Sequence, residues 1–215
     1  YIADKSDPHK IALRTQRLNI LDKYMGESQA VRIQYSAKKA SVANAWKKWQ
    51  GEAGGIKKMN TVVTKQAYEA AFEQWAKGTE YENTVARLAK LYKKLEPYNY
   101  ASEYYTETIR AVELLNFALR IGNMCVLGKV DLEQSQKAID DFYKDYYLPI
   151  DKETFIAMFD AFEKNVPENF HPQFFWNQMK IYGSAKEWAE EIDKVMDSPL
   201  PEKNQEKAKL FDISN

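Results

Sequence analysis

The sequence predicts an all-α fold, an irregular multi-helix domain of about nine or ten helices with no sheet, and three observations support this. Apolar residues recur at helical spacing in nearly every segment, and short breaks at glycine, proline or capping residues separate the segments. The β-branched run from Thr61 to Val63 is too short and isolated to form a sheet. No repeat of fixed length is visible, which argues against a solenoid. We therefore expect residues 1–215 to form a single all-α domain.

The composition is that of an ordinary globular domain and disfavours several classes of function. Of the 215 residues, 45% are hydrophobic and 29% are charged, and 31 acidic residues balance 31 basic ones. This balance gives no reason to expect nucleic acid or an anionic membrane as a partner. No window approaches the ~20 apolar residues of a membrane-spanning helix. The single cysteine, Cys125, excludes an internal disulfide, and its apolar neighbours lead us to expect a buried thiol.

Helix start and stop signals divide the first half of the chain into four expected helices. Most of them begin at a capping residue and end at glycine or proline. The expected limits are Asp7–Gly26, Val31–Gly51 with Gly54-Gly55 as the break, Thr64–Lys77, and a helix that Thr79 and Glu82 cap and Pro97 ends.

The second half is expected to contain one long helix followed by four shorter ones. The long helix, from about Ser102 to Leu127, is apolar on most sides and should be the most buried helix of the domain. The shorter helices are expected from Asp131 to Tyr147, from Asp151 to just before Pro167, around Phe174–Met179, and after a cap formed by Ser184 and Glu187.

The helix expected at Val31–Gly51 has two distinct faces. Bulky residues recur on one side at the i, i+3, i+4, i+7 spacing: Val31, Tyr35, Val42, Trp46 and Trp49. About half a turn away lies a line of smaller side chains: Ile33, Ala37, Ala40 and Asn44. We expect the aromatic face to pack into the domain and the smaller face to let a second body approach, with the Asn44 amide offering both donors and an acceptor. The competing explanation is ordinary helix propensity, with Asn44 as a solvated surface residue.

The sequence contains no complete catalytic or metal-binding motif. His9 and His171 are far apart, and neither has a second histidine or a glutamate at the spacing of a zinc motif. Neither a nucleophile elbow nor a phosphate-binding loop occurs. We therefore predict no metal, no cofactor and no catalytic residue in this chain.

Two further groups of residues have side chains that could take part in catalysis or binding. The acid pairs Asp140-Asp141 and Glu190-Glu191 lie among lysines, so we interpret them as solvated helix faces rather than acid–base catalysts. Four tyrosines could form a peptide or sugar platform, although packing between helices is the more common role of such side chains: Tyr98, Tyr100, Tyr104 and Tyr105. Taken alone, these residues indicate a binding or regulatory module.

Three segments carry a resemblance to a known family. KIALRTQRLNILDKYM, AVRIQYSAKKASVANAWKKWQGEAGGIKKMN and, more loosely, DKETFIAMFDAFEKNVPENFHPQFF resemble the helical domain of bacterial serine dipeptidyl-peptidases of peptidase family forty-six. The type is that of dipeptidyl-peptidases seven and eleven. The positions that match the family pattern are Arg14-Thr15-Gln16, Leu18-Asn19-Ile20, Val31-Arg32-Ile33, Tyr35, Lys38, Ala40, Asn44, Trp46-Lys47 and Gly51.

The resemblance implies a cap domain that works with a catalytic domain elsewhere in a longer chain. In the family, a chymotrypsin-like double β-barrel carries a Ser-His-Asp triad, and an all-α domain is inserted between its two halves. Residues 1–215 would be that insert, and its partners would be the β-barrel and the amino terminus of a peptide substrate. The resemblance also allows a homodimer of the parent enzyme. The parent would be a serine dipeptidyl aminopeptidase, whereas His9 and His171 do not match the catalytic histidine. The chain starts at Tyr1 rather than methionine, as an excised part would.

One functional residue follows from the resemblance. The family asparagine that helps to bind the substrate amino terminus matches Asn44, whereas we interpret Arg32, Tyr35 and Lys38 as structural. The resemblance also implies the periplasm or the cell surface of a Gram-negative bacterium. The alternative is a free-standing helical ligand-binding or scaffold protein with no catalytic partner domain, which would use the tyrosines. The flanking reading frame would distinguish the two.

Overall fold

Nine α-helices and two 3-10 helices make up residues 8–128 and 131–197, the part of the chain that the structure, a computed structural model, describes. No strand occurs in these ranges, so the predicted all-α fold is confirmed. The elements are α1 (Pro8–Glu27), α2 (Gln29–Lys58), α3 (Thr61–Ala76), α4 (Thr84–Glu107), η1 (Ile109–Ala111), α5 (Glu113–Val126), α6 (Leu132–Lys144), α7 (Leu148–Asn165), η2 (Glu168–Phe170), α8 (Gln173–Tyr182) and α9 (Ala185–Asp197). None of the described helices is both long and apolar enough to cross a membrane.

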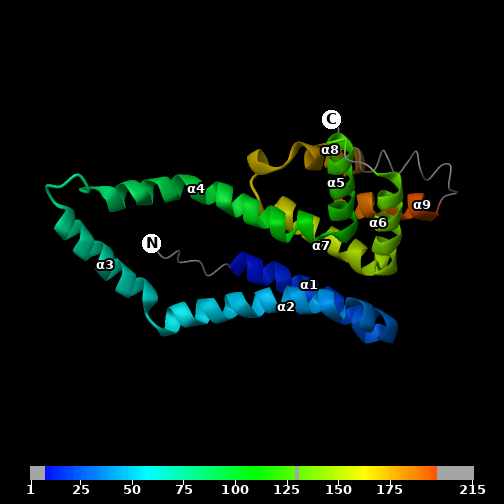
Figure 1. The fold of residues 1–215 in the computed structure, drawn as a ribbon, viewed down its shortest axis with the longest axis horizontal. Helices are drawn as coiled ribbons and strands as arrows, with labels where there is room; N and C mark the ends of the chain where they lie inside the picture. The colour runs from blue at the N-terminus through cyan, green and yellow to red at the C-terminus, as the bar shows by residue number, and fades with distance from the viewer. Residues whose placement is uncertain (1–7, 129–130, 198–215) are drawn as a thin grey trace.

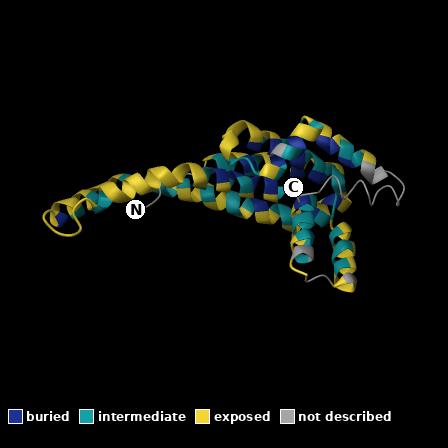
Figure 2. Cartoon of the chain, turned by 90° about the horizontal axis from the view of Figure 1, so that it is seen from above, coloured by how far each residue is buried: buried dark blue, intermediate teal, exposed yellow. Residues whose placement is uncertain are grey.

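The helices form a packed body and an extended arm. The arm, residues 50–97, consists of the outer end of α2, all of α3 and the first half of α4, and it reaches away from the body (Figure 1). Exposed residues dominate the arm (Figure 2), and Ala76 is the only buried residue among residues 50–97. The core therefore lies almost entirely in the body.

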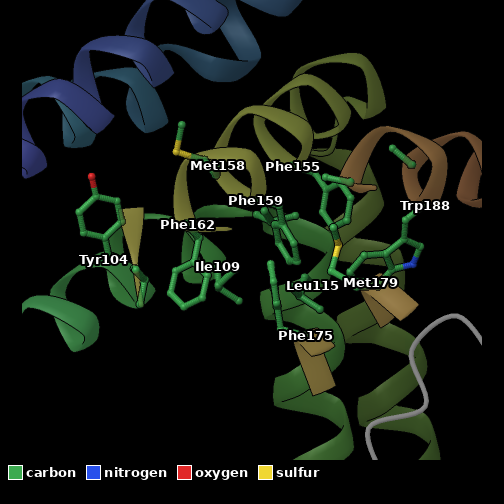
Figure 3. Close-up of a cluster of buried hydrophobic side chains, with 14 of the residues drawn as sticks. Tyr104, Ile109, Leu115, Phe155, Met158, Phe159, Phe162, Phe175, Met179 and Trp188 are labelled. Atoms are coloured by element: carbon green, nitrogen blue, oxygen red, sulfur yellow. The ribbon is translucent and has the colours of Figure 1, made fainter. Parts of the chain in front are cut away.

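The body contains two hydrophobic clusters. The larger one surrounds α7 and includes the aromatic side chains Phe155, Phe159, Phe162, Phe175 and Trp188 (Figure 3). The smaller one lies between α1 and α2 and receives Ile150 from the start of α7. α7 contributes to both clusters and is the most buried helix of the described chain. The prediction that the segment from Ser102 to Leu127 would be the most buried helix is therefore wrong.

That segment is not one helix either, because the chain breaks between α4 and α5. Thr108 adopts φ −110° and ψ −76°, its hydroxyl donates to the Tyr104 carbonyl at 2.6 Å, and the short helix η1 follows. The carboxylate of Asp151 then accepts the free N–H groups of Glu113 at 2.6 Å and Leu114 at 2.9 Å. Since Asp151 caps α5 rather than its own helix, the break depends on a residue distant in sequence.

Two expected helix ends lie further along the chain than predicted. α2 continues past Gly51 and Gly54-Gly55 to Lys58, because glycine costs a helix only about 1 kcal/mol per residue and the turn is made by Asn60, at φ 52°. α4 continues through Pro97, where the ring removes one helical hydrogen bond on an exposed stretch that water can solvate.

The bend between α3 and α4 also differs from the prediction. Gly78, at φ 72°, ends α3 as expected, but α3 begins at Thr61 and α4 only at Thr84, after Asn83 at φ 68°. Thr79 and Glu82 cap the intervening turn by accepting the N–H groups of Tyr81 and Gly78, each at 3.2 Å. They therefore stabilise a turn and do not open a helix.

The remaining expected limits hold to within a few residues. Asp131 caps α6 by accepting the Gln134 N–H at 2.9 Å, although α6 ends at Lys144 rather than at Tyr147. The predicted cap at Ser184 is confirmed, since its hydroxyl oxygen accepts the Glu187 N–H at 3.1 Å. α7 begins at Leu148, with proline in its first turn, rather than at Asp151. The expected cap at Asp7 and the side chain of Cys125 lie outside the described parts.

Candidate functional site

The candidate site lies on α2, which pairs with α1 in a helical hairpin (Figure 1). Ser28 lies between the two helices and caps α2 by accepting the Val31 N–H at 3.4 Å. With 30 residues, α2 is roughly 45 Å long. One end of α2 therefore belongs to the core and the other to the arm.

The aromatic face of α2 packs against the body, as the periodicity predicts. Val31, Tyr35 and Val42 are buried, and Trp46 and Trp49 are half-buried. The Tyr35 hydroxyl accepts the Tyr147 N–H at 2.9 Å, and burial raises the pKa of Tyr35.

Polar contacts fix the rotation of α2 about its own axis. The Trp46 indole N–H donates to the Thr15 hydroxyl at 2.9 Å. The Arg14 guanidinium donates to the carboxylate of Glu107 at 2.8 and 2.9 Å, and lies 4.5 Å from the ring centroid of Trp49. Together these contacts tie α2 to α1, and Arg14 in turn ties α1 to α4.

The opposite face of α2 is open to solvent. Ile33 is 69% exposed, and the three smaller side chains of the line are exposed as well: Ala37, Ala40 and Asn44. The Asn44 amide has no hydrogen-bond partner in residues 8–128 and 131–197, so its donors and its acceptor are free for a ligand. The two-faced geometry matches the expectation, while the substrate-binding role of Asn44 stays a prediction.

The charges around Asn44 limit what this face can do alone. Lys47 and Lys48 lie within one turn of it, and among the residues that the structure describes a carboxylate lies near Lys48 alone, that of Glu52 at 3.7 Å. A positive surface of this kind does not attract an ammonium group. Asn44 can accept one hydrogen bond from a peptide amino terminus, but the negative charge that balances the ammonium must come from another part of the protein.

The residues interpreted as structural divide into two kinds. Tyr35 is buried, and the Lys38 ammonium contacts Glu113 and donates to the Asp145 carbonyl, each at 2.5 Å, so both hold the body together. Arg32 is exposed, and its guanidinium has no ion pair within the described chain. The structure therefore assigns Arg32 no structural role.

The four tyrosines do not form a common platform. Tyr104 is buried and lies 4.9 Å from Tyr100, whereas Tyr98 is 63% exposed and contacts Phe170 at 5.2 Å. Tyr105 packs edge-on against the core. Tyr100 and Tyr104 share His9 as a neighbour, whereas Tyr98 and Tyr105 contact other rings, which fits packing between helices rather than one shared ligand surface.

The acid pairs and the histidines are engaged in local contacts. The carboxylates of both acid pairs contact side chains one turn away on their own exposed helix faces: Gln136, Lys144, Lys186 and Lys194. His9 lies 3.2 Å from Glu103, and His171 lies 2.7 Å from the Val166 carbonyl. Within the described residues, no group of three or more His, Cys, Asp or Glu side chains is placed to hold a metal ion.

Sequence reasoning missed a groove of about 580 Å³ beside α5. Arg110 and Arg120 line it together with Asn116 and Asn123. Asn116, Arg120 and Asn123 recur at the i, i+4, i+7 spacing along one side of α5, which would have been a usable signal. Because the whole segment looked like a single buried helix, its apolar faces drew the interpretation instead.

The fold is an all-α module in which one long helix packs its aromatic face against the body and leaves its opposite face exposed. Comparison with known proteins gives its family: the family model for peptidase S46 matches residues 1–213. The chain belongs to the peptidase S46 family.

Two groups of relatives carry names. The "Asp/Glu-specific dipeptidyl-peptidase" of Flavobacterium psychrophilum is 31% identical over 80% of this chain and 26% of the relative. The protein of the same name in Capnocytophaga gingivalis is 33% identical over 84% of this chain and 26% of the relative. The "Dipeptidyl-peptidase 7" of Porphyromonas gingivalis is 30% identical over 88% of this chain and 27% of the relative. The chain thus spans about a quarter of the length of these relatives.

A solved structure supports the fold. The crystal structure of Porphyromonas endodontalis DPP11 matches with a TM-score of 0.71 and 20% identity, over 96% of this chain and 30% of that one. At this identity the match establishes similarity of fold.

Proposed function

We propose that this chain is the helical cap domain of a serine exopeptidase that releases dipeptides from peptide amino termini. The parent enzyme would carry its Ser-His-Asp triad in a chymotrypsin-like β-barrel outside residues 1–215, with the helical domain inserted between the barrel halves. The cap would cover the active-site cleft, exclude water and help to hold the substrate amino terminus.

The observation that carries this proposal is the open face of α2. A family relationship to dipeptidyl-peptidases, with matches over about a quarter of their length, supports a part of such an enzyme. Within this part, α2 holds its aromatic face in the core and leaves the small side chains and the free Asn44 amide exposed. A face of small side chains lets a peptide approach the helix closely, and the amide supplies a directional hydrogen bond.

The test is Asn44→Ala in the full-length enzyme, with kcat/KM measured on a chromogenic dipeptidyl substrate. In the closed cleft, the Asn44→Ala variant leaves one N–H of the substrate ammonium without a hydrogen-bond acceptor. This should reduce transition-state stabilisation by about 1–3 kcal/mol and lower kcat/KM roughly 5- to 150-fold. Asn19→Ala is the matched control, because Asn19 is also exposed and without a side-chain hydrogen bond in the described chain, but lies on α1.

Two measurements separate binding from folding. The thermal midpoint of Asn44→Ala should equal that of the wild-type enzyme, and competitive inhibition by a free dipeptide should weaken in parallel with kcat/KM. An Asn44→Ala enzyme with unchanged kinetics, or one that loses activity only as much as the Asn19→Ala control, would remove Asn44 from the substrate site.

The same proposal includes a location and an assembly. The resemblance supports the periplasm or the cell surface of a Gram-negative bacterium, which detection of the protein in separated cell fractions tests. A homodimer of the parent enzyme is part of the proposal as well, and sedimentation of the full-length protein tests it. The rival, a free-standing helical scaffold, gains no specific support from the dispersed tyrosines.

A further inference from the structure

The groove beside α5 is lined by none of the residues of the exposed α2 face. It has a volume of about 580 Å³ and lies against η1, α5 and α6. α5 and α6 run side by side and project from the body (Figures 1 and 2). Their contact includes Phe117 stacked on Phe142, with ring centroids 4.3 Å apart, and both rings line the groove. The groove therefore has an apolar floor that two helices hold in place.

Two cations in the groove lack a counter-charge. Arg110 and Arg120 are exposed, and neither guanidinium has an ion pair in the part of the chain that the structure describes. Arg120 lies over the Phe117 ring at 5.2 Å, which orients it without neutralising it. Glu113 also lines the groove, but the Lys38 ammonium lies 2.5 Å from its carboxylate. The groove is thus left with two unpaired guanidinium groups, the side chains best suited to bind carboxylates.

Neutral hydrogen-bonding groups line the same wall, with Asn116 between the two arginines in sequence and Asn123 one turn beyond Arg120. Asn116 and Asn123 are exposed on α5, and their amides have no partner among residues 8–128 and 131–197. A side-chain amide offers both a donor and an acceptor, which is what the backbone of an extended peptide requires. The apolar floor, the side-chain amides and the two separate cations together fit a peptide better than a small anion.

We propose that this groove binds an extended, acidic peptide segment, with one carboxylate at Arg110 and another at Arg120. Arg120 lies about 10 Å along α5 from Glu113, and Arg110 lies three residues before Glu113 across the break at η1, so their backbones are at most about 20 Å apart. An extended chain covers that distance in at most about six residues at ~3.3 Å each. The occupant is therefore a segment with two acidic residues separated by no more than about five uncharged ones.

The charge pattern favours peptide over nucleic acid. Glu113 lies between the two arginines in sequence and lines the same groove. A nucleic acid strand carries a charge at every nucleotide and would bring phosphates next to that carboxylate, whereas a peptide can keep its carboxylates at the two ends.

The test is fluorescence anisotropy with full-length protein and a labelled peptide in which four uncharged residues separate two glutamates. The peptide is acetylated at its amino terminus, so its binding does not depend on the proposed role of Asn44. We expect Arg110→Gln and Arg120→Gln each to raise Kd about fivefold, the upper end for exposed ion pairs, and the double variant about 25-fold. Added salt should raise Kd as well. Arg87→Gln is the matched control, because Arg87 is an exposed arginine on the arm without an ion pair in the described chain, and it should leave Kd unchanged.

Three results would overturn the inference: no binding of the acidic peptide at low salt, equal binding of a peptide with lysines in place of the glutamates, or an unchanged Kd for the double variant. Stronger binding of a single-stranded oligonucleotide than of the peptide would overturn it too. Far-UV circular dichroism of each variant shows whether the helices are intact, so that a folding defect is not counted as support.

Discussion

Removing the Arg14 guanidinium should destabilise the body, because it would leave a carboxylate buried without its partner. Arg14 joins three helices: it lies on α1, donates to both oxygens of Glu107 on α4 at 2.8 and 2.9 Å, and reaches the Val42 carbonyl on α2 at 3.3 Å. The Arg14 side chain is 17% exposed and that of Glu107 6%. Methionine replaces Arg14 with an apolar chain of similar length and no charge.

The expected loss is about 3 kcal/mol. Removing one partner of a buried ion pair costs roughly 3–5 kcal/mol, because the remaining charge is left in a poorly solvating environment. The lower end applies here, because Arg17 interacts electrostatically with Glu107 and replaces part of the lost attraction. For a chain of this length, ~3 kcal/mol corresponds to a fall in Tm of about 6–12 °C.

Urea unfolding followed by circular dichroism measures this loss, and a double-mutant cycle assigns it. Replacing both Arg14 and Glu107 with methionine removes the pair without leaving a lone charge, so the double variant should lie within about 1 kcal/mol of wild type. The reasoning fails if Arg14→Met alone is as stable as wild type, or if the double variant loses the sum of the two single losses.

Two further predictions concern the contacts of α7. Burial raises the pKa of Asp151 to about 6, so the folded protein holds this proton more tightly than the unfolded chain does. Proton binding to Asp151 therefore stabilises the fold at low pH, and this stabilisation is lost as pH rises through about 6. Between about pH 7.5 and pH 5, wild type should gain about 1 kcal/mol of unfolding free energy relative to Asp151→Asn, and a relative loss would mean that the two backbone N–H bonds outweigh burial. Tyr35→Phe should cost about 1–2 kcal/mol in urea unfolding, because it leaves the Tyr147 N–H without its 2.9 Å partner, and an equally stable variant would contradict this.

The fold was predictable wherever the determining contacts are local. The two faces of α2 follow from side-chain spacing alone, and the stop at Gly78 and the cap at Ser184 depend on residues within one turn. The break after α4 was not predictable in this way, because Asp151 caps α5 from another helix. Pro97 misled the prediction, since an exposed helix tolerates one missing hydrogen bond.

The candidate site was predictable as a surface but not as a function. The spacing from Ile33 to Asn44 places those side chains together, and they are exposed together. What covers them depends on residues outside this chain, so the role of Asn44 rests on family resemblance. The groove at Arg110 and Arg120 was missed because those positions come together only after the break at η1.

The length of α2 makes it a lever. Its inner end is held in the core by Val31 and Tyr35, while its outer end carries an arm with almost no buried residues. A rigid rod of roughly 45 Å that tilts by about 10° moves its far end by about 8 Å. Small repacking at the seam between α1 and α2 would therefore be amplified into a large displacement of the arm.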